Sequence, residues 1–310
     1  MTLVYVTHPD CLGHDMGAGH PECPARLHAI EDQLLASGLS GTLHRVDAPL
    51  ATPAQLGRVH AAAYLSALAE ASPRRGVVHL DPDTAMSPRT LTAARRAAGA
   101  VVMATDLVMS GAAHAAFCAV RPPGHHAERA RAMGFCFFNN IAVGAAHALT
   151  EYGLRRVAIV DFDVHHGNGT EDIFRDDPRV LMVSTFQHPF YPYSGGEGRS
   201  DRMVNVPLPA YSGGPAFRAA VERDWMPALE SFRPEMVFIS AGFDAHRDDD
   251  MAMLALVEAD YDWVTRRILG VARRHAAGRV VSALEGGYDL HALGRSVVAH
   301  LKALDAPETE

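Results

Sequence analysis

Short apolar runs alternate with longer helical patterns along the whole 310-residue chain, and this alternation limits the possible folds more than any other feature. Six short runs of β-branched and other apolar residues are predicted strands, at 3–6, 115–120, 157–162, 180–185, 236–241 and 280–284. Predicted helices lie at 24–37, 87–109 and 140–152, and at roughly 215–231 and 256–276. Apolar strands that alternate with helices are typical of a parallel sheet covered on both faces. We therefore predict an α/β fold, a single three-layer αβα domain over residues 1–310 with a central, mostly parallel sheet.

The composition is ordinary for a soluble globular protein. Hydrophobic residues make up 48% of the chain and charged residues 21%, and the net charge of -8 gives no reason to expect nucleic-acid binding. The start, "MTLVYVTHPD", lacks the basic and long apolar regions of a signal peptide, and no stretch is apolar enough to span a membrane. The four cysteines form no C-x-x-C pair. We expect a cytoplasmic protein, and a homo-oligomer is compatible with this composition.

Polar and glycine-rich segments follow five of the predicted strands. In chain order they read "RPPGHHAE", "DVHHGNGT", "FQHPFYP", "GFDAH" and "EGGYDL". Ligands of parallel α/β sheets bind in the loops at the carboxyl ends of the strands. The convergence of five such segments on one edge of the sheet predicts an active site there.

Asp161, Asp163 and His165 are spaced by two, so an extended backbone points them to the same side. Asp163 and His165 offer an oxygen and a nitrogen ligand to one cation, and Asp244, after another strand, offers a third. Three such ligands with open positions are typical of catalytic Zn²⁺, and Fe²⁺, Co²⁺ or Mn²⁺ also accept them. The alternative is a polar strand end whose acids cap neighbouring helices. The arrival of Asp244 and the His125–His126 pair at the same edge favours the metal.

Two further segments suggest acid–base and oxyanion chemistry. The prolines and glycine of "RPPGHH" stiffen the loop that holds His125 and His126, and a neutral histidine suits a general base for a metal-activated water. The alternative is a stiff loop with exposed histidines. Tyr288 follows two glycines, and its phenol can donate a hydrogen bond to a developing oxyanion. Its alternative is a tyrosine packed on the rim. The segments "MGFCFFNN" and "HPFYPYSGGEG" mix aromatics with glycine, as expected of a narrow apolar channel.

Six segments together resemble the histone deacetylase superfamily, in its class II-like bacterial branch, which also contains acetylpolyamine amidohydrolases. In collinear order, from about residue 5 to 290, they are "HPECPARL", "RPPGHHA", "GFCFFNN", "DFDVHHGNGT", "SAGFDAH" and "EGGY". The resemblance implies an arginase/deacetylase-like fold and zinc-dependent amide hydrolysis.

The resemblance also implies catalytic roles for individual residues. His126 matches the general base, and His125 the neighbouring histidine that acts electrostatically and assists the leaving amine. Asp161 matches the buried acid that orients His125. Asn168 stands beside the base where class I enzymes have an aspartate, which follows the class II pattern. Tyr288 matches the tyrosine that polarises the scissile carbonyl, and a tyrosine rather than a histidine there is typical of fully active members.

Binding residues are carried over in the same way. The zinc ligands are Asp163, His165 and Asp244, and a potassium-type monovalent site would use Asp161, Asp163, His165, Ser184 and Thr185. The substrate-binding residues are Gly134, whose carbonyl would accept the amide N–H, and Phe135 and Tyr191, which would grip an acyl-lysine stem. The rim acid is assigned to Asp81, with Asp83 as its alternative, and a plain Asp–Pro turn explains this segment equally well. His166 is interpreted as structural.

We expect a zinc-dependent amidohydrolase that removes acetyl or other acyl groups from lysine side chains of proteins or peptides. The alternative substrate is a small acylated amine such as an acetylated polyamine, which an acidic rim would favour. A dimanganese ureohydrolase on the same fold is disfavoured, because too few aspartates cluster and "RPPGHH" and Tyr288 would have no role. A non-catalytic binding protein is disfavoured because every catalytic position is filled.

Overall fold

A computed structural model describes residues 2–196 and 200–306, and its centre is an eight-stranded sheet in which every pair of neighbouring strands is parallel. The strands lie in the order β2-β1-β5-β10-β9-β6-β7-β8. Their bounds are β1 Leu3–Thr7, β2 His44–Asp47, β5 Ala115–Cys118, β6 Val157–Asp161, β7 Val180–Gln187, β8 Met203–Leu208, β9 Met236–Ala241 and β10 Val280–Leu284. The predicted α/β fold with a largely parallel sheet is confirmed.

All six predicted strands exist, within three residues of their predicted ends. The two strands that the sequence did not predict, β2 and β8, are the two edges of the sheet. β2 reads "HRVD" and is largely exposed, so it lacks an apolar run. β8 contains Pro207, which has no N–H to donate and is tolerated in a strand that pairs on one side only.

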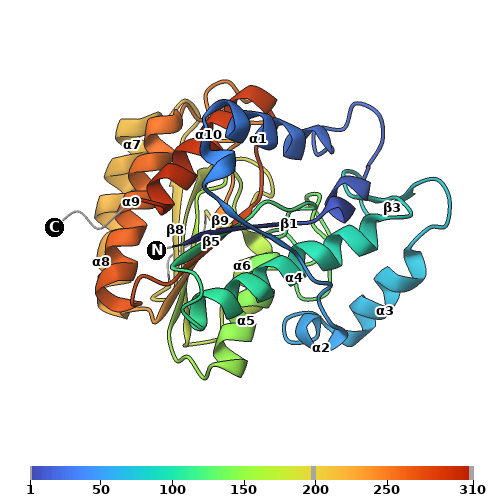
Figure 1. Ribbon diagram of the computed structural model, residues 1–310, viewed down its shortest axis with the longest axis horizontal. Helices are drawn as coiled ribbons and strands as arrows, with labels where there is room; N and C mark the ends of the chain where they lie inside the picture. Colours follow the sequence, from blue (N-terminus) through green and yellow to red (C-terminus); the bar gives the residue numbers. More distant parts are fainter. Residues whose placement is uncertain (1, 197–199, 307–310) are drawn as a thin grey trace.

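Helices cover both faces of the sheet and form the outer layers of a three-layer sandwich (Figure 1). One face carries α1 Ala25–Ala36, α7 Gly214–Ala220, α8 Met226–Phe232, α9 Glu258–His275 and α10 Leu290–Leu304. The other face carries α4 Thr90–Met109 and α5 Asn140–Glu151, with the short α2 Pro53–Leu56 and α6 Asn168–Phe174 beside α5. The helix predicted at roughly 215–231 is interrupted, since a π-helical turn at Val221–Trp225 joins α7 to α8.

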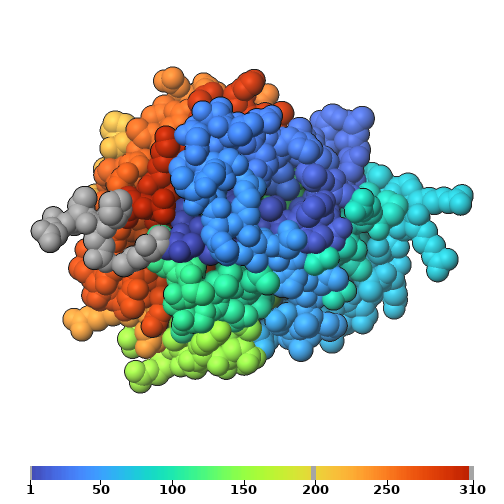
Figure 2. All heavy atoms as spheres, viewed as in Figure 1, coloured from blue at the N-terminus to red at the C-terminus, as the bar shows by residue number. Residues whose placement is uncertain are grey.

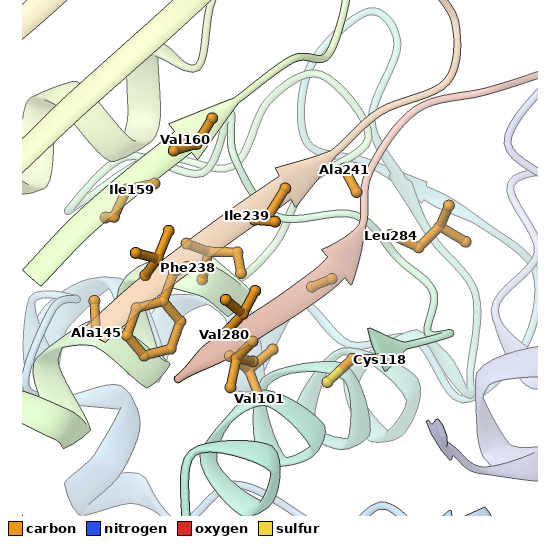
Figure 3. Close-up of a cluster of buried hydrophobic side chains, with 14 of the residues drawn as sticks. Val101, Cys118, Ala145, Ile159, Val160, Phe238, Ile239, Ala241, Val280 and Leu284 are labelled. Carbon is orange, nitrogen blue, oxygen red and sulfur yellow. The ribbon is translucent and has the colours of Figure 1, made fainter. Parts of the chain in front are cut away.

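The core lies between the sheet and these two helix layers. In Figure 3, Val101 of α4 and Ala145 of α5 lie beside Phe238 of β9 and Val280 of β10. The central strands β5, β6, β9 and β10 are buried at every position, which explains their continuous apolar sequences. This packing holds the central strands rigidly, and with them the loops that emerge from their carboxyl ends.

The remaining elements are short and lie outside the sheet. They are the 3₁₀ turns Pro9–Gly13 and Leu39–Gly41, the helix α3 Ala62–Ala71 and an antiparallel pair, β3 Val78–His79 with β4 Ala85–Met86. The segment between α3 and β3 stands out at one side of the molecule, where Figure 2 shows it in cyan. None of the described helices is both long enough and apolar enough to cross a membrane.

Candidate active site

Three adjacent strands bring the predicted metal ligands and the predicted oxyanion donor to one place. β10, β9 and β6 are neighbours in the sheet, and the loops after them carry Tyr288, Asp244 and the pair Asp163 and His165, respectively. Parallel strands that share a register end at the same edge, so residues more than a hundred positions apart in sequence meet there. This arrangement confirms the expectation that the site lies at the carboxyl ends of the strands.

Asp163, His165 and Asp244 form a buried group that has the donor atoms of a metal site. Their ligand atoms all lie within 4.8 Å of one another. His165 Nδ1 is 3.0 Å from Asp163 Oδ1 and 3.3 Å from Asp244 Oδ2. Asp244 Oδ2 is buried and has no hydrogen-bond partner, which is costly unless a cation occupies the space beside it. Burial and the nearby Asp163 carboxylate raise the pKa of Asp244 to about 6, and a bound cation would remove that repulsion.

Backbone groups fix the remaining oxygens of this group. Asp163 Oδ1 accepts the N–H of His165 at 2.8 Å, and Asp163 Oδ2 accepts the N–H of Gly286 at 2.8 Å. Asp244 Oδ1 accepts the N–H of Val164 at 3.0 Å. A side chain at Gly286 would overlap both carboxylates, so the glycine is required for the loop after β10 to approach them.

His125 and His126 lie side by side, with ring centroids 4.1 Å apart, and each ring has a different partner. His125 Nδ1 is 2.9 Å from Asp161 Oδ2, and His126 Nδ1 is 2.7 Å from Asn168 Oδ1. Burial works against a charged His125, but the charges of Asp163 and Asp161 raise its pKa well above the ordinary value. Burial together with the charges of His125 and His165 lowers the pKa of His126 well below the ordinary value. The two imidazoles are therefore tuned in opposite directions.

The orientation of Asn168 selects the tautomer of His126. Asn168 Nδ2 donates to Glu128 Oε1 at 2.8 Å, so the amide oxygen faces His126. That oxygen can only accept, and His126 Nδ1 must therefore carry the hydrogen. The lone pair of the neutral ring is then on Nε2, the nitrogen that is free to take a proton.

Glu285 is a site residue that the sequence analysis missed. Its Oε2 accepts the N–H groups of Gly124 and His125 at 2.6 and 3.1 Å, and burial raises its pKa to about 7. It therefore anchors the histidine loop to the end of β10. The glutamate of "EGGY" was part of a recognised motif, but its partners lie about 160 residues away, and no local pattern indicates them.

Tyr288 lies between an aromatic wall and a buried arginine. Its ring meets that of Phe135 edge-on at 5.9 Å, and the Arg26 guanidinium lies 4.8 Å from its ring centroid. Arg26 also donates to the carbonyls of Gly287 and Glu285, at 2.6 and 2.5 Å. Burial raises the pKa of Tyr288 well above its ordinary value, which keeps the hydroxyl protonated and able to donate.

A cavity of about 120 Å³ is lined by His125, His126, His165 and Tyr288, among others. The predicted substrate-binding residues Gly134, Phe135 and Tyr191 line it, as does Phe190, which the sequence analysis did not single out. Phe190 stacks on His165 with ring centroids 5.6 Å apart. Gly134 and Phe135 both have left-handed backbones, with φ of 56° and 68°, a strain that is typical of functional sites when a non-glycine residue adopts it.

The structure separates the two candidate rim acids. Asp83 lines the cavity. Asp81 instead closes a turn, since its Oδ1 accepts the N–H groups of Asp83 and Thr84 at 3.0 and 2.7 Å. The hydroxyl of Thr84 donates to Asp83 Oδ1 and accepts the N–H of Phe135. Thr84 therefore connects Asp83 to Phe135, another residue that lines the cavity. Of the two, Asp83 is thus the acid that lines the cavity, and the first assignment, Asp81, has the turn role that was its alternative.

Two other predictions concern residues just behind the cavity. Ser184 pairs in register with Asp161, and its buried hydroxyl has no hydrogen-bond partner, while Thr185 is buried beside it in β7.

His166 is placed between Ser194 Oγ and Glu171 Oε2, each 2.8 Å from one ring nitrogen. It does not line the cavity that holds His125 and His126, in agreement with its interpretation as structural.

Comparisons with known proteins agree with this geometry. The histone deacetylase domain model matches residues 20–304 of the chain. A histone deacetylase-like amidohydrolase of Pseudomonas aeruginosa is 41% identical over 281 residues, which cover 87% of this chain and 73% of that protein. The polyamine deacetylase HDAC10 of Mus musculus is 37% identical over 306 residues, covering 91% of this chain and 44% of that protein. The crystal structure of the HDA15 HD domain superposes with a TM-score of 0.92 at 34% identity, covering 98% of this chain and 89% of that one.

Proposed function

Because this chain belongs to the histone deacetylase family, we propose that it is a zinc-dependent amidohydrolase that removes acetyl or other acyl groups from lysine side chains of proteins or peptides. The observation that carries the proposal is that His165, which lies in one buried group with Asp163 and Asp244, lines the same cavity as His126 and Tyr288. A metal site, a base and an oxyanion donor within one pocket are the parts that metal-assisted amide hydrolysis needs.

Asp163, His165 and Asp244 would hold the metal, and their two carboxylates and one imidazole suit Zn²⁺, with Fe²⁺, Co²⁺ or Mn²⁺ as alternatives. A metal bound there would make water more acidic and polarise the acyl oxygen. Asp161 and Ser184, with Thr185 and backbone carbonyls near Asp163 and His165, would hold K⁺. The unpaired Ser184 hydroxyl beside Asp161 supports that second cation.

His126 would take the proton of the attacking water. Its lowered pKa keeps the ring neutral near pH 7, and Asn168 holds the hydrogen on Nδ1 so that Nε2 accepts. His125 has the opposite tendency, because Asp161 and Asp163 favour its charged form. A charged His125 would stabilise the negative charge that develops in the cavity and assist protonation of the leaving amine. Tyr288, protonated, would donate to the oxygen of the tetrahedral species.

The shape and lining of the cavity support a substrate with an extended aliphatic stem. Phe135, Phe190 and Tyr191 form an apolar wall around a volume that admits a chain of methylenes but no bulky group. Gly134 would offer its carbonyl to the amide N–H of the substrate. Asp83 is the acid on this wall, and we propose it, in place of Asp81, as the group that would hold the backbone N–H groups of a peptide.

A small acylated amine is the alternative substrate, favoured by the same Asp83, which would also attract the free ammonium of an acetylated polyamine. One panel of kcat/KM values separates the two. It compares an acetyl-lysine peptide, longer acyl-lysine peptides and acetylated diamines, on wild-type protein and on Asp83→Asn. We expect the peptide to be preferred. A strong preference for acetylated diamines that Asp83→Asn abolishes would overturn the protein or peptide assignment and leave the amidohydrolase chemistry in place.

A further inference from the structure

We propose that Asp249 is a positioning residue for Tyr288: it fixes the backbone that aims the tyrosine hydroxyl into the cavity. The inference rests on the proposed function, because it concerns the residue that would stabilise the oxyanion. Asp249 lies in the loop between β9 and α9 and touches none of the reacting groups. It would act entirely through the backbone of another loop.

The carboxylate of Asp249 is shared between two loops. It is only 4% exposed. Its Oδ2 accepts the backbone N–H groups of Tyr288 and Asp289, at 2.6 and 3.0 Å. Its Oδ1 accepts the N–H of Met251 at 3.0 Å. Two consecutive amides that donate to one carboxylate oxygen leave the peptide between Tyr288 and Asp289 little freedom to rotate.

Arg26 and Asp289 hold other parts of the loop that follows β10. Arg26 donates to the carbonyls of Glu285 and Gly287, the residues just before Tyr288. Asp289, the residue just after it, caps α10 by accepting the N–H of Ala292 at 2.7 Å. Arg26 thus holds the carbonyl of Gly287 and Asp249 holds the N–H of Tyr288, the two polar groups of one peptide. Gly287 itself has a φ of 121°, a backbone conformation that favours glycine. Without Asp249, Arg26 would still hold the Gly287 carbonyl, but the N–H groups of Tyr288 and Asp289 would lose their acceptor.

Asp249 also holds Met251, a residue of the cavity wall, in place relative to Tyr288. Met251, which its Oδ1 holds, lines the cavity together with Tyr288. Its neighbour Asp248 differs, because that side chain is 47% exposed and pairs with Arg295 at 3.0 Å. In the sequence "RDDDM" the three aspartates look alike, but the structure gives Asp249 the two bonds to the Tyr288 loop. Asp248→Asn is therefore a matched control.

The test is a double-mutant cycle on zinc-loaded full-length protein with an acetyl-lysine peptide. Asp249→Asn replaces the charged acceptor with an amide, and Asp248→Asn makes the same change one residue away. We expect Asp249→Asn to lower kcat about tenfold to a hundredfold with KM changed less than about threefold, since a displaced oxyanion donor weakens transition-state binding rather than ground-state binding. Asp248→Asn should leave kcat within about twofold of wild type.

The cycle shows whether Asp249 acts through Tyr288. In a Tyr288→Phe background the hydroxyl is already gone, so Asp249→Asn should lower kcat less than about threefold further. An equal fold-loss in both backgrounds, or a normal kcat in Asp249→Asn, would overturn the inference. If instead Tyr288→Phe alone keeps the wild-type kcat, both the inference about Asp249 and the proposed role of Tyr288 in amide hydrolysis are wrong. A slow Tyr288→Phe with a normal Asp249→Asn would reject only the role of Asp249.

A measurement on the wild-type protein covers the case in which Asp249→Asn does not fold. Backbone amides that donate to a buried carboxylate should exchange slowly with solvent, whereas loop amides normally exchange fast. We expect the amides of Tyr288 and Asp289 to be protected at least as strongly as that of Ala292, the first capped amide of α10. Fast exchange at both positions would contradict the proposed restraint.

Discussion

At the scale of single residues, the identity of the proposed base depends on one amide. His125 and His126 are adjacent in sequence and almost touch, yet their pKa values move in opposite directions. Despite burial, the charges of Asp163 and Asp161 raise the pKa of His125, whereas burial and the charges of His125 and His165 lower the pKa of His126. The doublet "HH" alone cannot distinguish the two histidines. Their hydrogen-bond partners, Asp161 and Asn168, lie 36 and 42 residues away.

We predict that Asn168→Leu lowers kcat for an acetyl-lysine peptide about tenfold to a hundredfold, part of the 10²–10⁴-fold that a positioned general base contributes. Leucine keeps the approximate volume but cannot accept from His126 Nδ1, so the ring loses its fixed tautomer. Steady-state kinetics on metal-loaded protein checks the prediction, with circular dichroism to confirm the fold. A wild-type kcat in a folded Asn168→Leu protein would rule out this role for Asn168.

The sequence revealed the residues with reactive side chains better than it revealed the residues that hold them. Asp163, His165, Asp244, His125, His126 and Tyr288 were predicted, and the structure brings them together. Glu285, Asp249 and Arg26 were given no role, because their partners are backbone groups on distant segments. A carboxylate that accepts two amides leaves no local pattern in the sequence.

At the scale of elements, a buried ion network joins the start of α1 to the end of β5 and to the loop after β10. Arg121 makes two hydrogen bonds to Glu22, at 2.5 and 2.7 Å, and Arg26 and His14 lie 3.3 and 3.2 Å from the same carboxylate. Glu22, Arg26 and Arg121 are all fully buried. Burial opposes ionisation of Glu22, but the two arginines and His14 hold its pKa well below the usual range.

We expect Glu22→Ala to reduce the free energy of unfolding by about 3–5 kcal/mol, because it leaves two buried guanidinium groups without their acid. The control is Glu222→Gln, which breaks the ion pair with Arg267 where both side chains are nearly half exposed, and which should cost less than about 1 kcal/mol. Urea unfolding of both variants measures the difference. Equal losses would show that the buried network contributes no more than a surface pair.

The strands inside the sheet could be predicted from the sequence, whereas the two strands at its edges could not. The six strands that pair on both sides were all found from their apolar runs. The edge strands β2 and β8 pair on one side only. β2 is largely exposed and has no apolar run, whereas β8 is buried except at Pro207, a residue that argues against a strand when the sequence is read alone. α10 was also missed, although Asp289 caps it and its buried residues recur at helical spacing, so a usable signal was present there.

At the scale of the whole molecule, two histidines that are buried in their neutral form make a contribution to stability that is lost on mild acidification. His60 donates from Nδ1 to the Glu128 carbonyl and accepts the N–H of Asn139 on Nε2, and burial lowers its pKa to about 4. His300 lies between Thr265 and Ser282 in the core, and burial lowers its pKa to about 3. In the unfolded chain both have a pKa of about 6.5.

Both folded pKa values are lower than the unfolded value, so at these two sites the unfolded chain binds more protons, and their contribution to stability falls as pH drops below about 6.5. The contribution of His60 is complete above that pH and is lost progressively toward pH 4. Each histidine adds a slope of up to about 1.4 kcal/mol per pH unit. His60→Gln should remove one such increment between pH 6 and 5 in denaturant titrations. An unchanged slope would show that His60 is not held neutral.

The most direct test of the central claim is metal reconstitution, because the proposed chemistry requires a cation at Asp163, His165 and Asp244. The protein is stripped with a chelator, Zn²⁺ is returned in steps below one equivalent, and acetate release from an acetyl-lysine peptide is measured at each step. We predict that activity is absent from the stripped protein, rises linearly with added Zn²⁺ to a plateau at one ion per chain, and stays absent in Asp244→Asn. Full activity in protein verified to be metal-free, or wild-type recovery by Asp244→Asn, would contradict the assignment.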